Sequence, residues 1–313
     1  GCPVLVTYKA KGVVADAHPL FGGVFTGGAA EAALLHQADL IILAGADPVE
    51  FVSQPWRYAA PVIDVASVPR HPHYFTAAAA LYGDVGLALA ELTAAGSDWT
   101  AEEIAQARNT WAASLTNGPS HGNRGISPQA VVELAQSACR EAGRHPRVSV
   151  DAGAHMFPCT SFWQAEEPGD LLISNGLASM GYALPAGIAA ALFDPGRGAI
   201  AFTGDGGLLM CLGELATAAT LGVKLTVVVF NDASLSLIDI KKGERALPEG
   251  GLDWPMVDFA AVMQGCGGLA FRADDEAGFA KAMAAALAAP GVALVDARVD
   301  PASYPAQIKA LRG

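Results

Sequence analysis

The first 95 residues alternate short runs of aliphatic and β-branched residues with alanine-rich stretches of helical character. This pattern predicts strands at 3–7, 39–44 and 61–65 and helices at 29–37 and 84–94. Strands that alternate with helices are typical of parallel βα units. We therefore expect a parallel α/β fold for this part of the chain.

The alternation ends after a predicted helix at 100–115, whose start carries Thr100 and Glu103 at the spacing of a capping box. The stretch that follows, TNGPSHGNRGIS, is polar and rich in glycine and proline, as linkers are. Ser127 and Pro128 then have the residue types of a helix N-cap and first helical position. The predicted organisation is a first domain at 1–118, a linker at 119–127 and a second domain at 128–313.

The second domain shows the same alternation over a longer stretch. Its predicted strands are 147–150, 170–173, 198–203, 225–230, 268–271 and 292–299, and its predicted helices are 128–142, 183–192, 207–221, 257–264 and 275–288. The expected fold class is α/β, with two parallel-sheet domains of Rossmann-like type and helices on both faces of the second sheet.

Composition and charge narrow the class of protein. Hydrophobic residues make up 52% of the 313 residues and charged residues 16%, which excludes global disorder. The net charge of −12 argues against nucleic acid or an anionic membrane as the main partner. Five cysteines without a CxxC pair indicate neither a disulfide framework nor a zinc site, so a reducing cytoplasm is expected. The uncharged window 174–193 contains glycines and a proline, and it is interpreted as a buried loop and helix rather than a membrane span.

The segment 199–237 contains the residues that most clearly indicate a ligand-binding site. An apolar strand ends in Gly204-Asp205-Gly206-Gly207, a helix follows, and a second apolar strand ends in Asn231-Asp232. Neighbouring parallel strands would bring both ends to the carboxyl edge of one sheet, where open α/β folds bind ligands. Glycines allow close approach of a phosphate, and a helix N-terminus favours an anion. Oxygen ligands there suit a divalent cation that holds a diphosphate, although a Gly-Asp-Gly sequence also occurs in ordinary turns.

This segment resembles the thiamine diphosphate motif, in which Gly-Asp-Gly is followed by a helix, a strand and an Asn-Asn pair. The match is to the acetolactate synthase, pyruvate oxidase and pyruvate decarboxylase superfamily. The segments at 150–156 and 175–185 are similar to the parts of that family that approach the diphosphate and the aminopyrimidine. The resemblance implies cofactor binding by Gly153, His155, Ala178, Met180, Gly204, Gly206, Gly207, Asn231 and Ser234. Met180 has the position of the side chain that wedges between the two cofactor rings, and plain core packing is its alternative role.

The resemblance also implies a Mg²⁺ site with Asp205, Asp232 and the backbone carbonyl of Ser234 as ligands. Asp232 stands where the family has its second Asn, so Asn231 becomes a neighbour of the metal rather than a ligand. Leu237 and Ile238 would face the substrate, or else form the apolar face of a short helix.

The first domain resembles the second half of the family's central domain. It has no Gly-rich dinucleotide fingerprint, and Asp64-Val65-Ala66-Ser67 departs from the usual Asp-Pro ending, so a structural role is expected rather than binding of FAD or ADP. The same absence disfavours a nicotinamide-dependent dehydrogenase.

By resemblance, the chain is a lyase or transferase that decarboxylates a 2-oxo acid and passes the product to an acceptor, as acetolactate synthase does. No catalytic residue is expected within it, because the family's activating glutamate belongs to a pyrimidine-binding domain that this sequence does not match. Glu166 and Glu167 are the loop residues considered as substitutes. We expect a fragment or one half of a split enzyme that meets a pyrimidine-binding domain in trans or in a full-length protein, as a homo-oligomer. The alternatives are a non-catalytic cofactor-binding or scaffolding subunit and a non-carboligating decarboxylase of the benzoylformate decarboxylase type.

Overall fold

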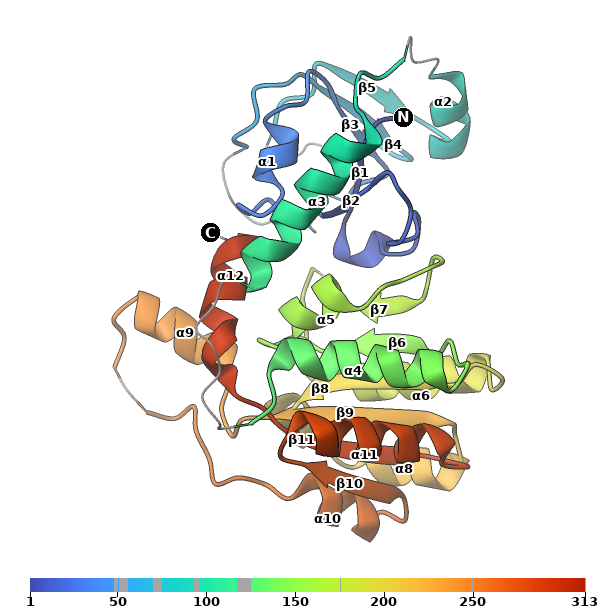
Figure 1. The fold of residues 1–313 in the computed structure, drawn as a ribbon, viewed down its shortest axis with the longest axis vertical. Coiled ribbons are helices and arrows are strands. Elements are labelled where there is room, and N and C mark those ends of the chain that lie inside the picture. The colour runs from blue at the N-terminus through green and yellow to red at the C-terminus, as the bar shows by residue number, and fades with distance from the viewer. Residues whose placement is uncertain are drawn as a thin grey trace.

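The computed structural model describes residues 1–47, 50, 56–69, 75–92, 96–116, 125–174, 176–248 and 250–312. Within these residues the chain is an α/β protein with three sheets, and every strand pair in them is parallel, which confirms the predicted fold class. Figure 1 shows the two larger sheets at opposite ends of the molecule.

The second half is built on a six-stranded sheet. Its strand order is β10 (Leu269–Ala273), β11 (Ala293–Arg298), β9 (Leu225–Asn231), β8 (Ala199–Gly204), β6 (Arg147–Val150) and β7 (Leu171–Ile173). One face packs against α4 (Pro128–Glu141), α5 (Met156–Phe162) and α11 (Glu276–Ala288), and the other packs against α6 (Ala183–Phe193), α8 (Glu214–Leu221) and α10 (Phe259–Gly265) (Figure 1). Along β9, Val228 and Phe230 join the first core and Val227 and Val229 join the second. Because both faces are covered, β8 and β9 are buried at every position and consist mainly of apolar residues.

The first half divides into two small sheets instead of one. The first pairs β1 (Val4–Val6) with β2 (Phe21–Val24), and the second orders β3 (Ile41–Ala44), β4 (Val62–Ala66) and β5 (Ala79–Tyr82). Around them lie η1 (Tyr8–Ala10), α1 (Ala32–Leu35), α2 (Val85–Glu91) and α3 (Ala101–Thr116). The sequence pattern did not predict β2 or β5. The first contains two glycines and the second is exposed at all four positions, so neither has the alternation that marks a half-buried strand.

Two predicted helix starts are confirmed. The Thr100 amide donates to the Glu103 carboxylate at 2.8 Å, and the Glu103 amide donates to the Thr100 hydroxyl at 3.2 Å, so the capping box forms. The Ser127 hydroxyl accepts from the Ala130 amide at 3.1 Å with Pro128 in the first turn. Of the predicted linker, 119–124 lie outside the described residues, and Ile126 is buried and pairs with Val299 beyond the end of β11.

Two predicted helices are wrong in extent. The stretch 29–37 is an α-helix only over α1, at Ala32–Leu35. The stretch 207–221 forms two helices, α7 (Asp205–Met210) and α8, with a break at 211–213. Gly213 at the start of α8 is the one glycine in this break, and the apolar residues on either side concealed it. The end of β8 is therefore followed by a helix of six residues, shorter than the helix expected from the sequence.

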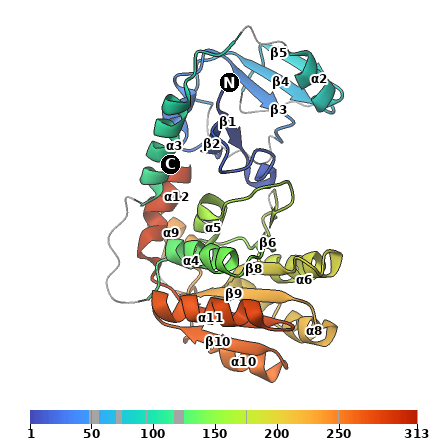
Figure 2. The same ribbon diagram turned by 45° about the vertical axis from the view of Figure 1, so that its right-hand side comes forward.

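The chain does not end on the strand predicted at 292–299. It continues into α12 (Tyr304–Arg312), which lies against α3 in both views (Figures 1 and 2). The Ala310 carbonyl accepts from the amides of Ala29 and Ala30 at 3.0 and 2.9 Å. The core packed around β1, β2 and α3 therefore continues into the second half of the sequence, whereas β3 and β4 have a separate core of their own.

The turn that receives α12 is organised by the buried carboxylate of Glu31. It accepts hydrogen bonds from the amides of Thr26, Gly27 and Gly28, and the Thr26 hydroxyl donates to the Leu311 carbonyl at 2.6 Å. Gly28 is required there, because a Cβ would overlap the Leu311 backbone. The turn thus links the first half of the chain to its last helix.

We expect Glu31 to make stability depend on pH. Burial raises the pKa of Glu31 above 4.5, although hydrogen bonds from backbone N–H groups oppose the shift. The folded state therefore holds this proton more tightly than the unfolded state, so the contribution of Glu31 is greatest below about pH 4.5 and declines as pH rises through the folded-state pKa. The difference in free energy of unfolding between wild type and Glu31→Gln should fall between pH 4.5 and 8, by at most about 1.4 kcal/mol per pH unit. Urea unfolding measures it, with exposed Glu102→Gln as control. A pH-independent difference would contradict the prediction.

Candidate cofactor and metal site

The predicted site lies where the order of the large sheet reverses. From β6 the chain moves outward to β7, then returns to β8 and continues through β9 in the other direction. The crevice beyond the carboxyl ends of β6 and β8 is therefore a topological switch point, the usual ligand site of open α/β sheets. Asp151 follows β6, Asp205 follows β8 and Asp232 follows β9.

The structure brings Asp205 and Asp232 together as predicted from their strands. One oxygen of the buried Asp205 carboxylate accepts from the Gly206 amide at 2.7 Å, and the other accepts from the Ala233 amide at 2.6 Å. Burial, followed by the Asp232 charge, raises the pKa of Asp205 to about 7. Burial raises the pKa of Asp232 to about 6, against a hydrogen bond from the Ser236 hydroxyl. A buried carboxylate, Asp205, and a partly buried one, Asp232, thus lie close together, an arrangement that favours the neutral acids unless a cation compensates their charge.

Ser234, the predicted carbonyl ligand, lies in the turn after β9. Ala233 has φ +60°, and an isolated antiparallel bridge joins Ser234 to Asp253. Among the described residues, no three His, Cys, Asp or Glu side chains form a metal-binding group. A cation here would depend on Asp205, Asp232, backbone oxygen and oxygens of the ligand itself.

Asn231 belongs to a different set of contacts. Its amide nitrogen donates to the Val257 carbonyl at 3.0 Å and to the Asp296 carboxylate at 2.8 Å, and Asp296 also accepts from Arg298 at 2.8 Å. The buried Asn231 Oδ1 has no partner among the described residues. The amide nitrogen is therefore committed to Val257 and Asp296, and the role of Asn231 as a neighbour rather than a ligand stays a prediction.

His155 occupies the start of α5 beneath the crevice. Its ring is buried, stacks on Phe230 with centroids 5.3 Å apart, and leaves Nε2 without a partner among the described residues. Burial lowers the pKa of His155 to about 4, although the Asp151 charge opposes the shift. A Cβ on Gly153 would lie 2.6 Å from the imidazole, and one on Gly204 would lie 3.1 Å from it. The glycines thus leave room for a neutral imidazole with an unused nitrogen.

Gly206 is a second position where neighbouring side chains lie close to the backbone. A Cβ there would lie 2.6 Å from Leu235, 3.2 Å from Trp254 and 3.4 Å from the methyl group of Met180. The side chain of the half-buried Met180 thus lies beside the Gly204–Gly207 turn, although 26 positions separate Met180 from Gly206 in the sequence. Ala178 is exposed with φ +52°, and Asn175, at the start of the same predicted segment, lies outside the described residues.

The two predicted substrate residues fall on α9 (Ser236–Glu244) and differ in environment. Leu237 is partly buried and packs against the main core, whereas Ile238 is 46% exposed. Successive helical residues project about 100° apart. Of the pair, Ile238 is the side chain that remains accessible to a ligand.

Asp151 is the organising residue that sequence reasoning missed. Its buried carboxylate accepts from the amides of Gly181 and Tyr182 at 3.0 and 2.9 Å and from the Thr203 hydroxyl at 2.9 Å. A Cβ on Gly207 would overlap the same carboxylate. Asp151 therefore connects the turn at 180–182 to the ends of β6 and β8 by hydrogen bonds. An aspartate directly after a buried strand was the available signal.

Tyr304 is a second residue that the sequence analysis missed. It begins α12, is buried, and has a pKa raised by burial and then by the Asp232, Cys159 and Asp205 charges. The start of the last helix is therefore close to the paired carboxylates.

Glu166 and Glu167 do not lie at the candidate site. The hypothesis that either one replaces the family's activating glutamate is therefore wrong. Their amides donate to Asp170, directly before β7, at 2.9 Å each, and Glu167 pairs with Arg197, before β8, at 2.6 Å. Asp205 follows the opposite end of β8. The length of a strand therefore separates these glutamates from the site.

We expect Asp151→Asn to lower the free energy of unfolding by about 3 kcal/mol, because the asparagine NH₂ would face buried N–H donors that have no other acceptor. Urea unfolding measures the change. Exposed Asp98→Asn is the matched control and should shift stability by less than about 0.5 kcal/mol. Equal stability of the two variants would show that Asp151 does not hold the site together.

Two family models match the chain. The model for the C-terminal TPP-binding domain of thiamine pyrophosphate enzymes covers residues 151–297, and the model for their central domain covers residues 1–92.

Similar curated proteins share these domains. The Bacillus subtilis protein YdaP, whose name describes it as thiamine pyrophosphate-containing, is 32% identical over 85% of this chain and 46% of its own length. Acetolactate synthases of Bacillus subtilis and Mycobacterium bovis are 24% and 30% identical over 95% and 76% of this chain and 54% and 40% of their own lengths. The chain thus spans about half the length of the curated relatives it matches. No helix in the described part of the chain combines the length and apolar character needed to cross a membrane.

Proposed function

Because the chain belongs to the thiamine pyrophosphate enzyme family, we propose that it binds thiamine diphosphate with Mg²⁺ beyond β8 and β9 and contributes this half of a 2-oxo acid decarboxylase. The observation that carries the proposal is the pair of adjacent carboxylates, Asp205 buried and Asp232 partly buried, with pKa values raised to about 7 and 6.

The residues present fit a diphosphate and its cation. The two carboxylates share one end of the sheet, neither forms an ion pair with a cationic side chain among the described residues, and oxygen donors of this kind are preferred by Mg²⁺. Beside them, Gly204 and Gly206 are positions where a Cβ would crowd His155 or Leu235. The uncommitted Nε2 of His155 supplies a hydrogen-bonding atom in the same crevice.

When bound, thiamine diphosphate supplies the electron sink that decarboxylation of a 2-oxo acid needs. The residues of this chain would orient the bound cofactor and shield it from water. Asp205 and Asp232, with the Ser234 carbonyl, would hold the cation, and the Asp205 contact with the Ala233 amide keeps the ends of β8 and β9 in register. Met180 would support the ring system, since it is an apolar side chain at the edge of the diphosphate loop.

We infer that a 2-oxo acid is the substrate class, as in the acetolactate synthases among the relatives. Ile238 is the exposed apolar residue of α9 available to contact it. The specific oxo acid and the acceptor would be determined by α9 and by the partner domain.

The proposal includes a partner that completes the site. Around the crevice, Leu177 is 91% exposed and Met210 is 63% exposed, with Leu209 also exposed. Large apolar side chains gathered at a crevice mark an interaction surface. A pyrimidine-binding domain, in trans or in a longer protein, would cover them, and a homo-oligomer would repeat the arrangement.

We expect Asp232, and not Asn231, to bind the metal. Asp232→Ala should weaken Mg²⁺ affinity at least about tenfold, because it removes a charged ligand, whereas Asp232→Asn should retain most of the affinity through its amide oxygen. Asn231→Ala should lower stability and leave Mg²⁺ affinity within about threefold of wild type. Calorimetric titration with Mg²⁺ and thiamine diphosphate tests these expectations. A larger loss of affinity in Asn231→Ala than in Asp232→Ala would mean that the metal register is wrong.

A further inference from the structure

The segment between α9 and α10 turns back onto the candidate metal site. The Leu235 amide donates to the Leu252 carbonyl at 2.9 Å, and the Trp254 amide donates to the Ala233 carbonyl at 3.2 Å. An isolated antiparallel bridge lies between these two hydrogen bonds. The residues 252–254 are therefore held by backbone contacts alongside the turn that follows β9, the turn that carries the proposed metal ligands.

This backbone pairing places the Trp254 ring beside the Gly204–Gly207 turn. A Cβ on Gly206 would lie 3.2 Å from Cη2 of the indole. The same Cβ would lie 2.6 Å from Leu235 and 3.4 Å from the methyl group of Met180. Three apolar side chains from separate segments of the chain thus lie around one point of the backbone. Each of the three is half-buried, so each keeps surface that a ligand can contact.

The Trp254 ring and Met180 differ in how well they are fixed. The indole Nε1 is buried and has no hydrogen-bond partner among the described residues, so the ring contributes apolar contact at this place. The ring is rigid, and its backbone is held on the turn at 233–235. Met180 has an unbranched side chain with three rotatable bonds and adapts its shape to its neighbours. The position of its methyl group therefore depends on the rigid ring that lies around the same point.

The proposed cofactor site thus has two parts formed by different side chains. A cation at Asp205 and Asp232 would hold a diphosphate whatever group is attached to it. An organic ring system attached to that diphosphate would gain apolar contact with Met180. A residue that fixes Met180 should therefore affect ligands that carry the rings and leave a plain diphosphate unaffected.

We propose that Trp254 is a positioning residue for cofactor recognition, which fixes Met180 beside the Gly204–Gly207 turn and so makes the site prefer thiamine diphosphate over a diphosphate without rings. The inference rests on the proposed function, because it takes Met180 as the side chain that contacts the ring system.

Calorimetric titration in the presence of Mg²⁺, with thiamine diphosphate and with inorganic diphosphate, tests the proposal. Trp254→Leu should weaken thiamine diphosphate affinity at least about fivefold and leave inorganic diphosphate affinity within about twofold of wild type. Trp254→Phe keeps an aromatic ring and should weaken thiamine diphosphate affinity by about two- to threefold. The half-buried Trp99, which precedes α3, provides the matched control, and Trp99→Leu should bind both ligands as wild type does.

A double-mutant cycle tests whether Trp254 acts through Met180. Met180→Ala removes the side chain that Trp254 is proposed to position. Adding Trp254→Leu to Met180→Ala should therefore weaken thiamine diphosphate affinity by less than about twofold beyond Met180→Ala alone. Losses that add in full would show that Trp254 contacts the cofactor independently and would overturn the positioning role.

Thermal unfolding followed by circular dichroism identifies the folded variants, and Trp254→Phe carries the comparison if Trp254→Leu does not fold. The inference is overturned if the folded variant binds thiamine diphosphate as wild type does. It is also overturned if the affinities for both ligands fall equally, because Trp254 would then only support the turn with the metal ligands. Wild type that binds inorganic diphosphate and Mg²⁺ but shows no preference for thiamine diphosphate would overturn the proposed function, and the inference with it.

Discussion

Asp205→Ala should abolish measurable binding of thiamine diphosphate in the presence of Mg²⁺, a loss of affinity of at least about 100-fold, or about 2.7 kcal/mol. Asp205 is the proposed ligand that links the metal to the end of β8, and its second oxygen holds the Ala233 amide at 2.6 Å beside the other proposed ligands. Its removal takes away a metal ligand and the contact that positions the turn. Without the cation, Asp232 would face the diphosphate as a like charge. Isothermal titration calorimetry with and without Mg²⁺ is the measurement.

The matched control is Asp274→Asn, which alters an exposed aspartate paired with Arg272 at the surface and should leave affinity unchanged. Wild type treated with EDTA should lose binding as Asp205→Ala does. If wild type binds thiamine diphosphate equally well after EDTA treatment, binding does not need the metal and that part of the proposal is wrong.

The 313 residues by themselves should not decarboxylate pyruvate at an enzymatic rate, even when saturated with thiamine diphosphate and Mg²⁺. The described residues place no glutamate beside the candidate site in an acid-base role, since Glu166 and Glu167 lie before β7 at the other edge of the sheet. General acid-base groups contribute about 10²- to 10⁴-fold to such reactions. Exposed Leu177 and Met210 also leave the crevice open to water. Supplying a pyrimidine-binding domain, from the full-length gene or an adjacent subunit, should raise the rate at least about 100-fold.

Coupled detection of carbon dioxide release provides the assay, and the same mixture made with Asp205→Ala should stay inactive. Decarboxylation by the 313 residues unaided would contradict the expected need for a partner. A complex that binds thiamine diphosphate and Mg²⁺ tightly but remains inactive toward a panel of 2-oxo acids would favour the non-catalytic subunit instead.

The candidate site was predictable where its residues adjoin buried strands. The runs 198–203 and 225–230 are long and apolar, so their ends could be located to within one residue, and parallel pairing then brings Asp205 and Asp232 to one edge. The capping box at Thr100 was equally local, because a hydrogen bond across three residues depends on the adjacent sequence alone.

The tertiary structure alone decided how distant segments meet. The position of Asp151 is visible after its strand, but its role depends on the turn at Gly181 and Tyr182 folding back onto it, some 30 positions later. The helix α12 carries Ile308 and Leu311 at helical spacing, yet their burial against the first half of the chain rests on a turn organised by Glu31.

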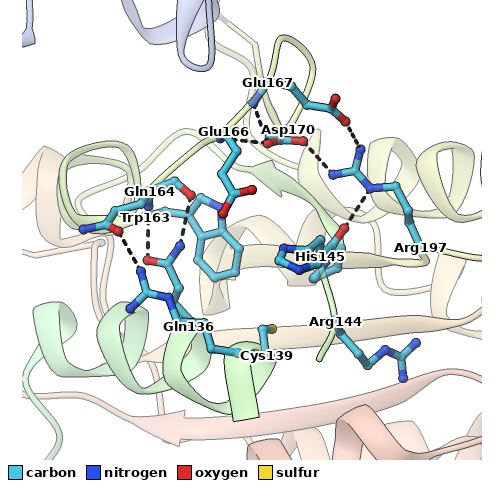
Figure 3. Close-up of a pocket in the computed structure, with 12 residues that line it drawn as sticks. Gln136, Cys139, Arg144, His145, Trp163, Gln164, Glu166, Glu167, Asp170 and Arg197 are labelled. Atoms are coloured by element: carbon cyan, nitrogen blue, oxygen red, sulfur yellow. Dashed lines mark hydrogen bonds and ion pairs between the residues drawn. The ribbon is translucent and has the colours of Figure 1, made fainter. Parts of the chain in front are cut away.

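A cavity of about 500 Å³ between the end of α4 and the amino ends of β6, β7 and β8 (Figure 3) likewise has no signature in the sequence, since these elements are brought together by the sheet order. Periodicity reports which face of an element is apolar, and that much this sequence determined by itself. Which surface covers that face, and which charged side chains remain without partners beside it, depends on contacts between distant residues that local pattern does not encode.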